Sequence, residues 1–157
     1  MQRLEEMLKE SIALIEKEHI DVYSFGITYD VYNRWMVACI DTEENSLLAI
    51  SQHRAFARKH FNDLIQPGNQ LGYDMLVHWG AATGRNTSLG DYRYHRVAEH
   101  QYPDDFSYDK AFIMDAIRLV ISYQDRITTY SHDQDDVVFS CGTAEDEYGI
   151  SWYRVRS

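Results

Sequence analysis

Two pairs of adjacent strand-like segments, one near each end of the chain, restrict the possible folds more than any other feature. Residues 22–29 alternate in a β manner, and the nearly all-apolar residues 35–40 follow after a short polar link. Residues 137–140 and 149–155 form the second pair, around an acidic link. Strands joined by short links form hairpins, so the sequence predicts a largely antiparallel sheet built from two hairpins.

Apolar side chains recur at helical spacing in three further segments, residues 3–18, 41–64 and 109–127. Asp41 begins the second of them with a side chain that can cap free amides, and Glu44 stands at the capping-box position. The apolar stripe expected for this helix is Leu47, Ile50, Ala57, Phe61 and Leu64. The residues expected to be largely buried in the core are Phe25, Trp35, Val37, Phe112, Ala116, Leu119 and Val138. Hairpins separated by helices predict an α+β fold with about three packed helices.

The middle of the chain gives weaker signals. Tyr73–Trp79 has the composition of a strand, residues 80–90 and 101–108 that of loops, and residues 92–97 fit either a strand or a helical turn. The 157 residues are the usual size of one domain, and no repeat or linker interrupts them. We therefore predict a single domain, residues 1–157, with a possible middle strand in the sheet.

The charge of the chain is strongly negative and unevenly distributed. The formal net charge is −10, with −6 in residues 1–50, +2 in residues 51–100 and −6 in residues 101–157. This balance argues against binding nucleic acid through phosphate contacts, which requires Lys and Arg on one face. It is compatible with a role in solubility alone, or with electrostatic steering toward a basic protein partner.

The candidate partner-binding residues are acidic side chains that turns would expose beside the last two strands. They are Asp133, Asp135, Asp136, Glu145, Asp146 and Glu147. Carboxylates in such turns can face Lys and Arg on a partner, and an exposed aromatic side chain would add an apolar anchor. Tyr130 and Tyr148 are the candidates for that anchor.

No motif in the sequence indicates catalysis, a metal site or a cofactor. The glycine-containing segment 80–86 lacks the Lys-Ser/Thr ending of a phosphate loop, and no Gly-x-Ser-x-Gly occurs. The seven histidines and two cysteines do not fall at metal-ligand spacing. Residues 78–86 and 92–96 mix aromatic and basic side chains, which fits either binding of a single-stranded nucleic acid or an acidic partner, or a strand whose tyrosines pack while Arg93 and His95 face water. We predict no catalytic residue, no metal and no cofactor.

The sequence also predicts a cytoplasmic location. No apolar run approaches the roughly 20 residues of a membrane span, and residues 1–10 alternate charged and apolar side chains, unlike a signal peptide. Cys39 and Cys141 both lie in apolar, β-like surroundings and are expected to be core residues. A disulfide between them is an alternative that the sequence leaves open.

Several segments resemble those of a bacterial family of unknown function, DUF4303. The first strand reads Tyr23-Ser24-Phe25-Gly26-Ile27-Thr28-Tyr29-Asp30. The second ends in Asp41-Thr42-Glu43-Glu44, where the family typically has Asn-Thr-Glu-Glu. A segment around Trp79 follows the second helix, and Val137-Val138-Phe139, an acidic loop and a last strand close the chain. Members are often encoded in polymorphic-toxin immunity loci, and no catalytic residues are defined for them. The resemblance therefore implies a binding protein.

Three functions are open on this basis. The first is a non-enzymatic immunity protein that neutralises a cognate bacterial toxin by direct binding through an acidic surface; the toxin is expected to be a basic protein, for which a nuclease is one candidate. The second is a small metal-dependent hydrolase that uses scattered His, Asp and Glu side chains. The third is an adaptor domain with no toxin partner.

Overall fold

The computed structural model describes residues 1–69, 85–86, 89–143 and 150–155. The chain divides into two compact units, which are described separately. The first unit comprises Met1–Thr42 and Thr87–Ser157, and the second comprises Glu43–Asn86.

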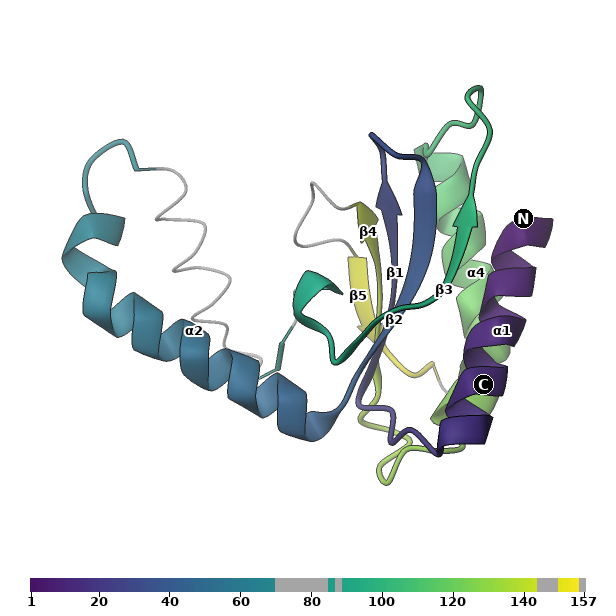
Figure 1. The fold of residues 1–157 in the computed structure, drawn as a ribbon, viewed down its shortest axis with the longest axis horizontal. Coiled ribbons are helices and arrows are strands. Elements are labelled where there is room, and N and C mark those ends of the chain that lie inside the picture. Colours follow the sequence, from purple (N-terminus) through teal and green to yellow (C-terminus); the bar gives the residue numbers. More distant parts are fainter. Residues whose placement is uncertain (70–84, 87–88, 144–149, 156–157) are drawn as a thin grey trace. The chain divides into compact units, whose positions relative to one another are not determined.

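The first unit is built on a five-stranded sheet (Figure 1). In chain order the strands are β1 (Ser24–Asp30), β2 (Trp35–Asp41), β3 (Tyr94–Gln101), β4 (Val138–Thr143) and β5 (Ile150–Tyr153). Their order across the sheet is β3-β2-β1-β4-β5, and every neighbouring pair is antiparallel except β1 and β4. The predicted α+β class, the two hairpins and the largely antiparallel sheet are confirmed. The single parallel pair was not predicted.

Helices α1 (Gln2–Glu18) and α4 (Lys110–Thr128) cover one face of this sheet (Figure 1). Helix α4 begins at Asp109, whose side chain accepts a hydrogen bond of 2.9 Å from the backbone nitrogen of Phe112 and so pairs one free amide of the first turn. Helix α1 ends at His19 in the left-handed conformation, with φ of 51°. Both helices lie where the apolar periodicity predicts them.

The main core lies between these helices and the sheet. Phe25 and Phe139, on adjacent strands, are fully buried there, as are Ala116 and Ile127 of α4. The prediction of a largely buried core is confirmed for Phe25, Val37, Ala116 and Val138. The other three predicted residues, Trp35, Phe112 and Leu119, are half-buried at the margins of the two apolar clusters.

The other face of the sheet carries small side chains and a second apolar cluster. That cluster consists of Val37, Cys39, Leu89 and Tyr92, and Leu89 belongs to a 3₁₀ turn, η1 (Leu89–Asp91). Leu89 lies so close to Gly26 that a Cβ placed on the glycine would be 2.1 Å from Leu89 Cδ2. Glycine in β1 therefore leaves the space that the Leu89 side chain fills.

Of the two structures that residues 92–97 fit by sequence, the strand is the observed one. Strand β3 runs at the edge of the sheet and is mostly exposed, and its register against β2 shifts between Ala38 and Ile40. Arg96, near this irregularity, has a φ of 60°. Residues 102–109 form neither helix nor strand, as predicted for a loop. The possible strand at 73–79 and most of the loop at 80–90 lie outside the described residues.

The described part of the second unit is mainly helix α2 (Glu43–Leu64). Its extent agrees with the prediction, but the predicted apolar stripe is partly wrong, because Leu47 and Phe61 are exposed while Ser46 and Ala49 are buried. The hydroxyl of the buried Ser46 accepts a hydrogen bond of 2.8 Å from the backbone nitrogen of Asn86. Asp41 is not part of this helix but the last residue of β2.

Asp41 links two segments of the first unit. Its side chain is fully buried, and Oδ1 lies 3.1 Å from the backbone nitrogens of both Thr42 and Arg93. Because Arg93 immediately precedes β3, these bonds hold the start of that strand against the end of β2.

Candidate protein-binding surface

The parallel pairing of β1 with β4 brings two acidic segments together. Ser24 is the register partner of Val138, so the chain enters both strands from the same end of the sheet. Residues 16–21 precede β1 and residues 125–136 precede β4. These segments are more than 100 residues apart in sequence, yet they meet at this end.

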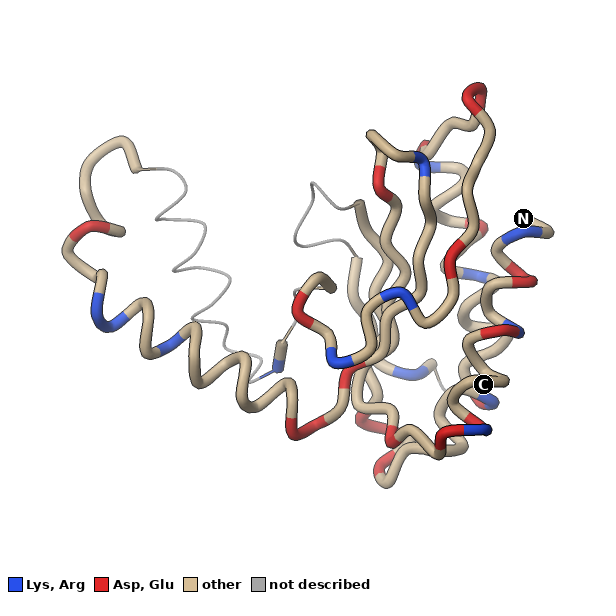
Figure 2. Tube along the Cα trace, viewed as in Figure 1, with Lys and Arg blue, Asp and Glu red and all other residues tan. Residues whose placement is uncertain are grey.

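We name this region the acidic end and define it as residues 16–21, residues 125–136 and Arg154. It contains three basic residues, Lys17, Arg126 and Arg154, and seven acidic ones, a formal net charge of −4. The acidic residues are Glu16, Glu18, Asp21, Asp125, Asp133, Asp135 and Asp136, and all are exposed. Figure 2 shows acidic residues, coloured red on the Cα trace, in both segments at the end of the sheet from which β1 and β4 begin.

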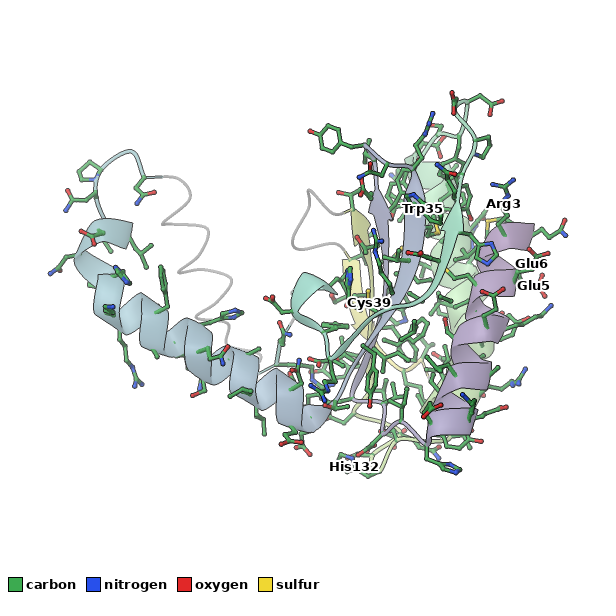
Figure 3. All side chains as sticks on the ribbon, viewed as in Figure 1. Arg3, Glu5, Glu6, Trp35, Cys39 and His132 are labelled. Atoms are coloured by element: carbon green, nitrogen blue, oxygen red, sulfur yellow. The ribbon has the colours of Figure 1, made fainter. Side chains whose placement is uncertain are left out.

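Asp21 and His132 join the two segments directly. One carboxylate oxygen of Asp21 lies 3.1 Å from the backbone nitrogen of His132, and the other lies 3.0 Å from its ring Nδ1. A carboxylate can only accept, so the ring nitrogen is the donor. His132 is labelled in Figure 3 at this end of the molecule. Glu16 and Arg126 add a second link, 3.4 Å long.

Arg154, just after β5, holds the turn before β4 in place. Its guanidinium lies 3.0 Å from Asp125 Oδ1, 3.2 Å from Gln134 Oε1 and 3.9 Å from Asp135 Oδ1. The Arg154 side chain is only 22% exposed, so its charge is directed inward to these partners. The turn is therefore anchored to both α4 and the strand end, while its carboxylates remain at the surface.

The structure describes four of the eight predicted binding residues. Asp133, Asp135 and Asp136 are exposed in the acidic end, whereas Tyr130 is half-buried and packs against the core rather than standing free. The remaining candidates lie outside the described residues: Glu145, Asp146, Glu147 and Tyr148. In the sequence, Asp136 lies before β4 (Val138–Thr143) and those four lie after it, so the strand separates the two acidic segments along the chain.

Four acidic residues of this surface were not predicted as candidates: Glu16, Glu18, Asp21 and Asp125. These residues can be identified only from the structure. The parallel register of β1 and β4 is what places Glu16, Glu18 and Asp21 beside the turn at 133–136. The uneven charge of the sequence indicates that both terminal thirds are acidic, but it does not indicate which acids meet.

The two cysteines do not form a disulfide. Cys39 on β2 and Cys141 on β4 are paired with consecutive residues of the intervening strand, Gly26 and Ile27, so they face opposite sides of the sheet. Burial raises the pKa of Cys39 to about 11 and also raises the pKa of Cys141. Both thiols are therefore protonated at neutral pH and poor nucleophiles.

Metal-binding and membrane-spanning features are not found in the described part of the chain. Within the described ranges, no three His, Cys, Asp or Glu side chains are grouped so that they could hold a metal ion. Among the same residues, no helix has the length and apolar character needed to cross a membrane. The comparisons with known proteins found no matching protein-family model, no similar curated protein and no similar solved structure.

Proposed function

We propose that this chain is a non-enzymatic binding protein that neutralises a cognate toxin by covering a basic surface with the acidic end. The observation that carries the proposal is the convergence of residues 16–21 and 125–136 at one end of the sheet, which concentrates negative charge in a firmly anchored region. A nuclease that binds phosphates presents the complementary basic surface. The resemblance to a family found in toxin-immunity loci favours the same function.

The physical basis of the proposal is electrostatic. A surface with a net charge of −4, on a chain with a net charge of −10, attracts a basic partner over distances of about the Debye length, roughly 8 Å at physiological ionic strength. Exposed charges of this kind mainly raise the association rate and make it sensitive to salt. Affinity then depends on apolar contacts near the charged residues.

The test is to co-express the chain with the product of the neighbouring gene and to measure association rate against salt. A triple variant, Asp133→Asn, Asp135→Asn and Asp136→Asn, removes three charges from the acidic end. A matched variant, Asp104→Asn, Asp105→Asn and Asp115→Asn, removes three charges from elsewhere on the first unit. At low salt we expect the first variant to slow association about tenfold and the second less than about threefold, and the difference should shrink at high salt.

Stoichiometry separates binding from turnover. A binding protein neutralises the toxin only when it is present in at least equal amount, whereas an enzyme would neutralise an excess. Neutralisation by a small fraction of one equivalent would overturn the non-enzymatic proposal. Equal effects of the two triple variants would overturn the assignment to the acidic end, and failure to bind the neighbouring product would overturn the immunity function.

A further inference from the structure

Among the described strands, β5 lies at one edge of the sheet. It pairs with β4 on one side, and no described strand lies on the other. The backbone nitrogen of Arg154 donates to the carbonyl oxygen of Val137, so the backbone of Arg154 faces the β4 side of the ladder. Because this direction alternates from residue to residue along the ladder, the backbone N–H and C=O groups of Ser151 and Tyr153 point away from β4.

The side chain of Gln124 closes this open side at one point. Its Oε1 accepts a hydrogen bond of 3.0 Å from the backbone nitrogen of Val155, and its Nε2 donates to the carbonyl oxygen of the same residue. These are the two bonds that a residue of a neighbouring strand would make. The open stretch therefore ends at Tyr153, which fixes where an added strand must stop.

Tyr153 also stands beside the acidic end. Its register partner is Val138, which lies two residues after Asp136. Tyr153 itself directly precedes Arg154. Its side chain is 56% exposed, and Ile150 and Val155 are exposed to a similar degree. An aromatic side chain with this exposure, next to a surface of net charge −4, has the character of an interface anchor.

We propose that the partner adds an extended segment to β5 at Ser151 and Tyr153, and that this segment carries alternating apolar and basic side chains. Main-chain bonds to the open edge provide pairing, Tyr153 provides apolar contact, and the carboxylates of the acidic end receive the Lys or Arg side chains. This inference deepens the proposed function, on which it rests, by specifying how the basic partner docks.

The experiment uses the full chain and synthetic peptides, so that it does not depend on the neighbouring gene. The probe is an acetylated, amidated hexapeptide of alternating Lys and Val. Its controls are the same peptide with alternate backbone nitrogens methylated, and a Glu-Val hexapeptide. Binding is followed by amide chemical shifts of the ¹⁵N-labelled protein. We expect the largest shifts at Ser151 and Tyr153, binding that weakens with salt, and at least roughly tenfold weaker binding of both controls.

Two variants complete the test. Tyr153→Ala should weaken peptide binding by roughly tenfold, whereas Tyr32→Ala, which removes an equally large exposed ring from the β1–β2 link, should leave it unchanged. Absence of binding, shifts centred away from β5, or equal binding of the methylated peptide would each overturn the inference. So would a dimer of the free chain in sedimentation equilibrium that Tyr153→Ala abolishes, because a second copy would then occupy the edge.

The two proposals fail independently. If the peptide does not bind but the acidic-end variant still slows toxin association, strand addition is wrong and the proposed function stands. If the neighbouring product does not bind but the peptide does, the toxin assignment is wrong and β5 remains a site for extended basic segments.

Discussion

Asp21, in the segment before β1, accepts two hydrogen bonds from His132, in the turn before β4. This pair is one of two links between the acidic segments, and both side chains are about half exposed. We expect Asp21→Ala to lower the free energy of unfolding by about 0.5–1.5 kcal/mol, because two hydrogen bonds are lost at a site where solvent replaces them partly. Urea denaturation measures the change. Asp105→Ala, an exposed loop acid, is the matched control and should change stability by less than about 0.5 kcal/mol.

The close approach of Leu89 to Gly26 predicts strong coupling between these positions. Gly26→Ala would place a methyl group 2.1 Å from Leu89 Cδ2, so the leucine must shift. We expect a loss of about 1–3 kcal/mol from overpacking. In the double variant with Leu89→Ala the new methyl has room, so the two losses should not add. A double-mutant cycle in urea measures the coupling, and additive losses would mean that Leu89 does not pack on β1.

The burial of α4 predicts which apolar truncation is the more damaging. Ile127 is fully buried, whereas Leu119 is half-buried. We expect Ile127→Ala to lower the free energy of unfolding by about 2–5 kcal/mol, since it removes buried methylenes and leaves a cavity, and Leu119→Ala to cost clearly less. Equal costs in denaturant melts would show that the buried side of the helix has been placed wrongly.

Because the thiol of Cys39 is buried, we expect the protein to lose stability at alkaline pH. Burial raises the pKa of its thiol from the ordinary value of 9 to about 11 in the folded chain, so the folded state holds the proton more tightly than the unfolded state. The stabilisation is fully present below pH 9 and is lost as the pH rises toward 11, to a limit of roughly 3 kcal/mol. Urea melts from about pH 8 to about pH 11 should show a steeper fall in stability for the wild type than for Cys39→Ala. Parallel pH profiles would contradict this assignment.

The sequence predicts the individual helices and strands better than it predicts how they are arranged in space. The helices at 2–18 and 110–128 and the strands at 24–30 and 35–41 follow from short-range apolar periodicity, which the chain carries within each segment. Strand β3 is ambiguous in sequence because it is an exposed edge strand with an irregular register, so its apolar alternation is weak. The stripe predicted for α2 is partly wrong because the buried side includes Ser46 and Ala49, which a search for large apolar residues does not select.

The candidate surface is only partly predictable from the sequence, because some of its residues are brought together by the pairing of distant strands. Asp133, Asp135 and Asp136 are recognisable as a turn before a strand, and the structure places them at the surface. In the sequence, nothing distinguishes Asp21 from other acidic residues that follow a helix. In the structure, the register of Ser24 with Val138 brings it beside His132. Nothing local in the sequence distinguishes a parallel from an antiparallel arrangement of the two hairpins, so the composition of this surface depends on the fold.

The single parallel pair in the sheet also determines the order in which the chain can fold. Four residues separate β1 from β2, whereas 107 residues separate β1 from β4. Closing the short loop costs far less chain entropy, so the first hairpin can form while the last third of the chain is still being synthesised. During that interval the second edge of β1 has no neighbour and can pair with another strand. The arrival of β4 covers this edge of β1 and removes the hazard there, so the step that brings residues 16–21 and 125–136 together is also the step that protects this edge of the nascent chain from aggregation.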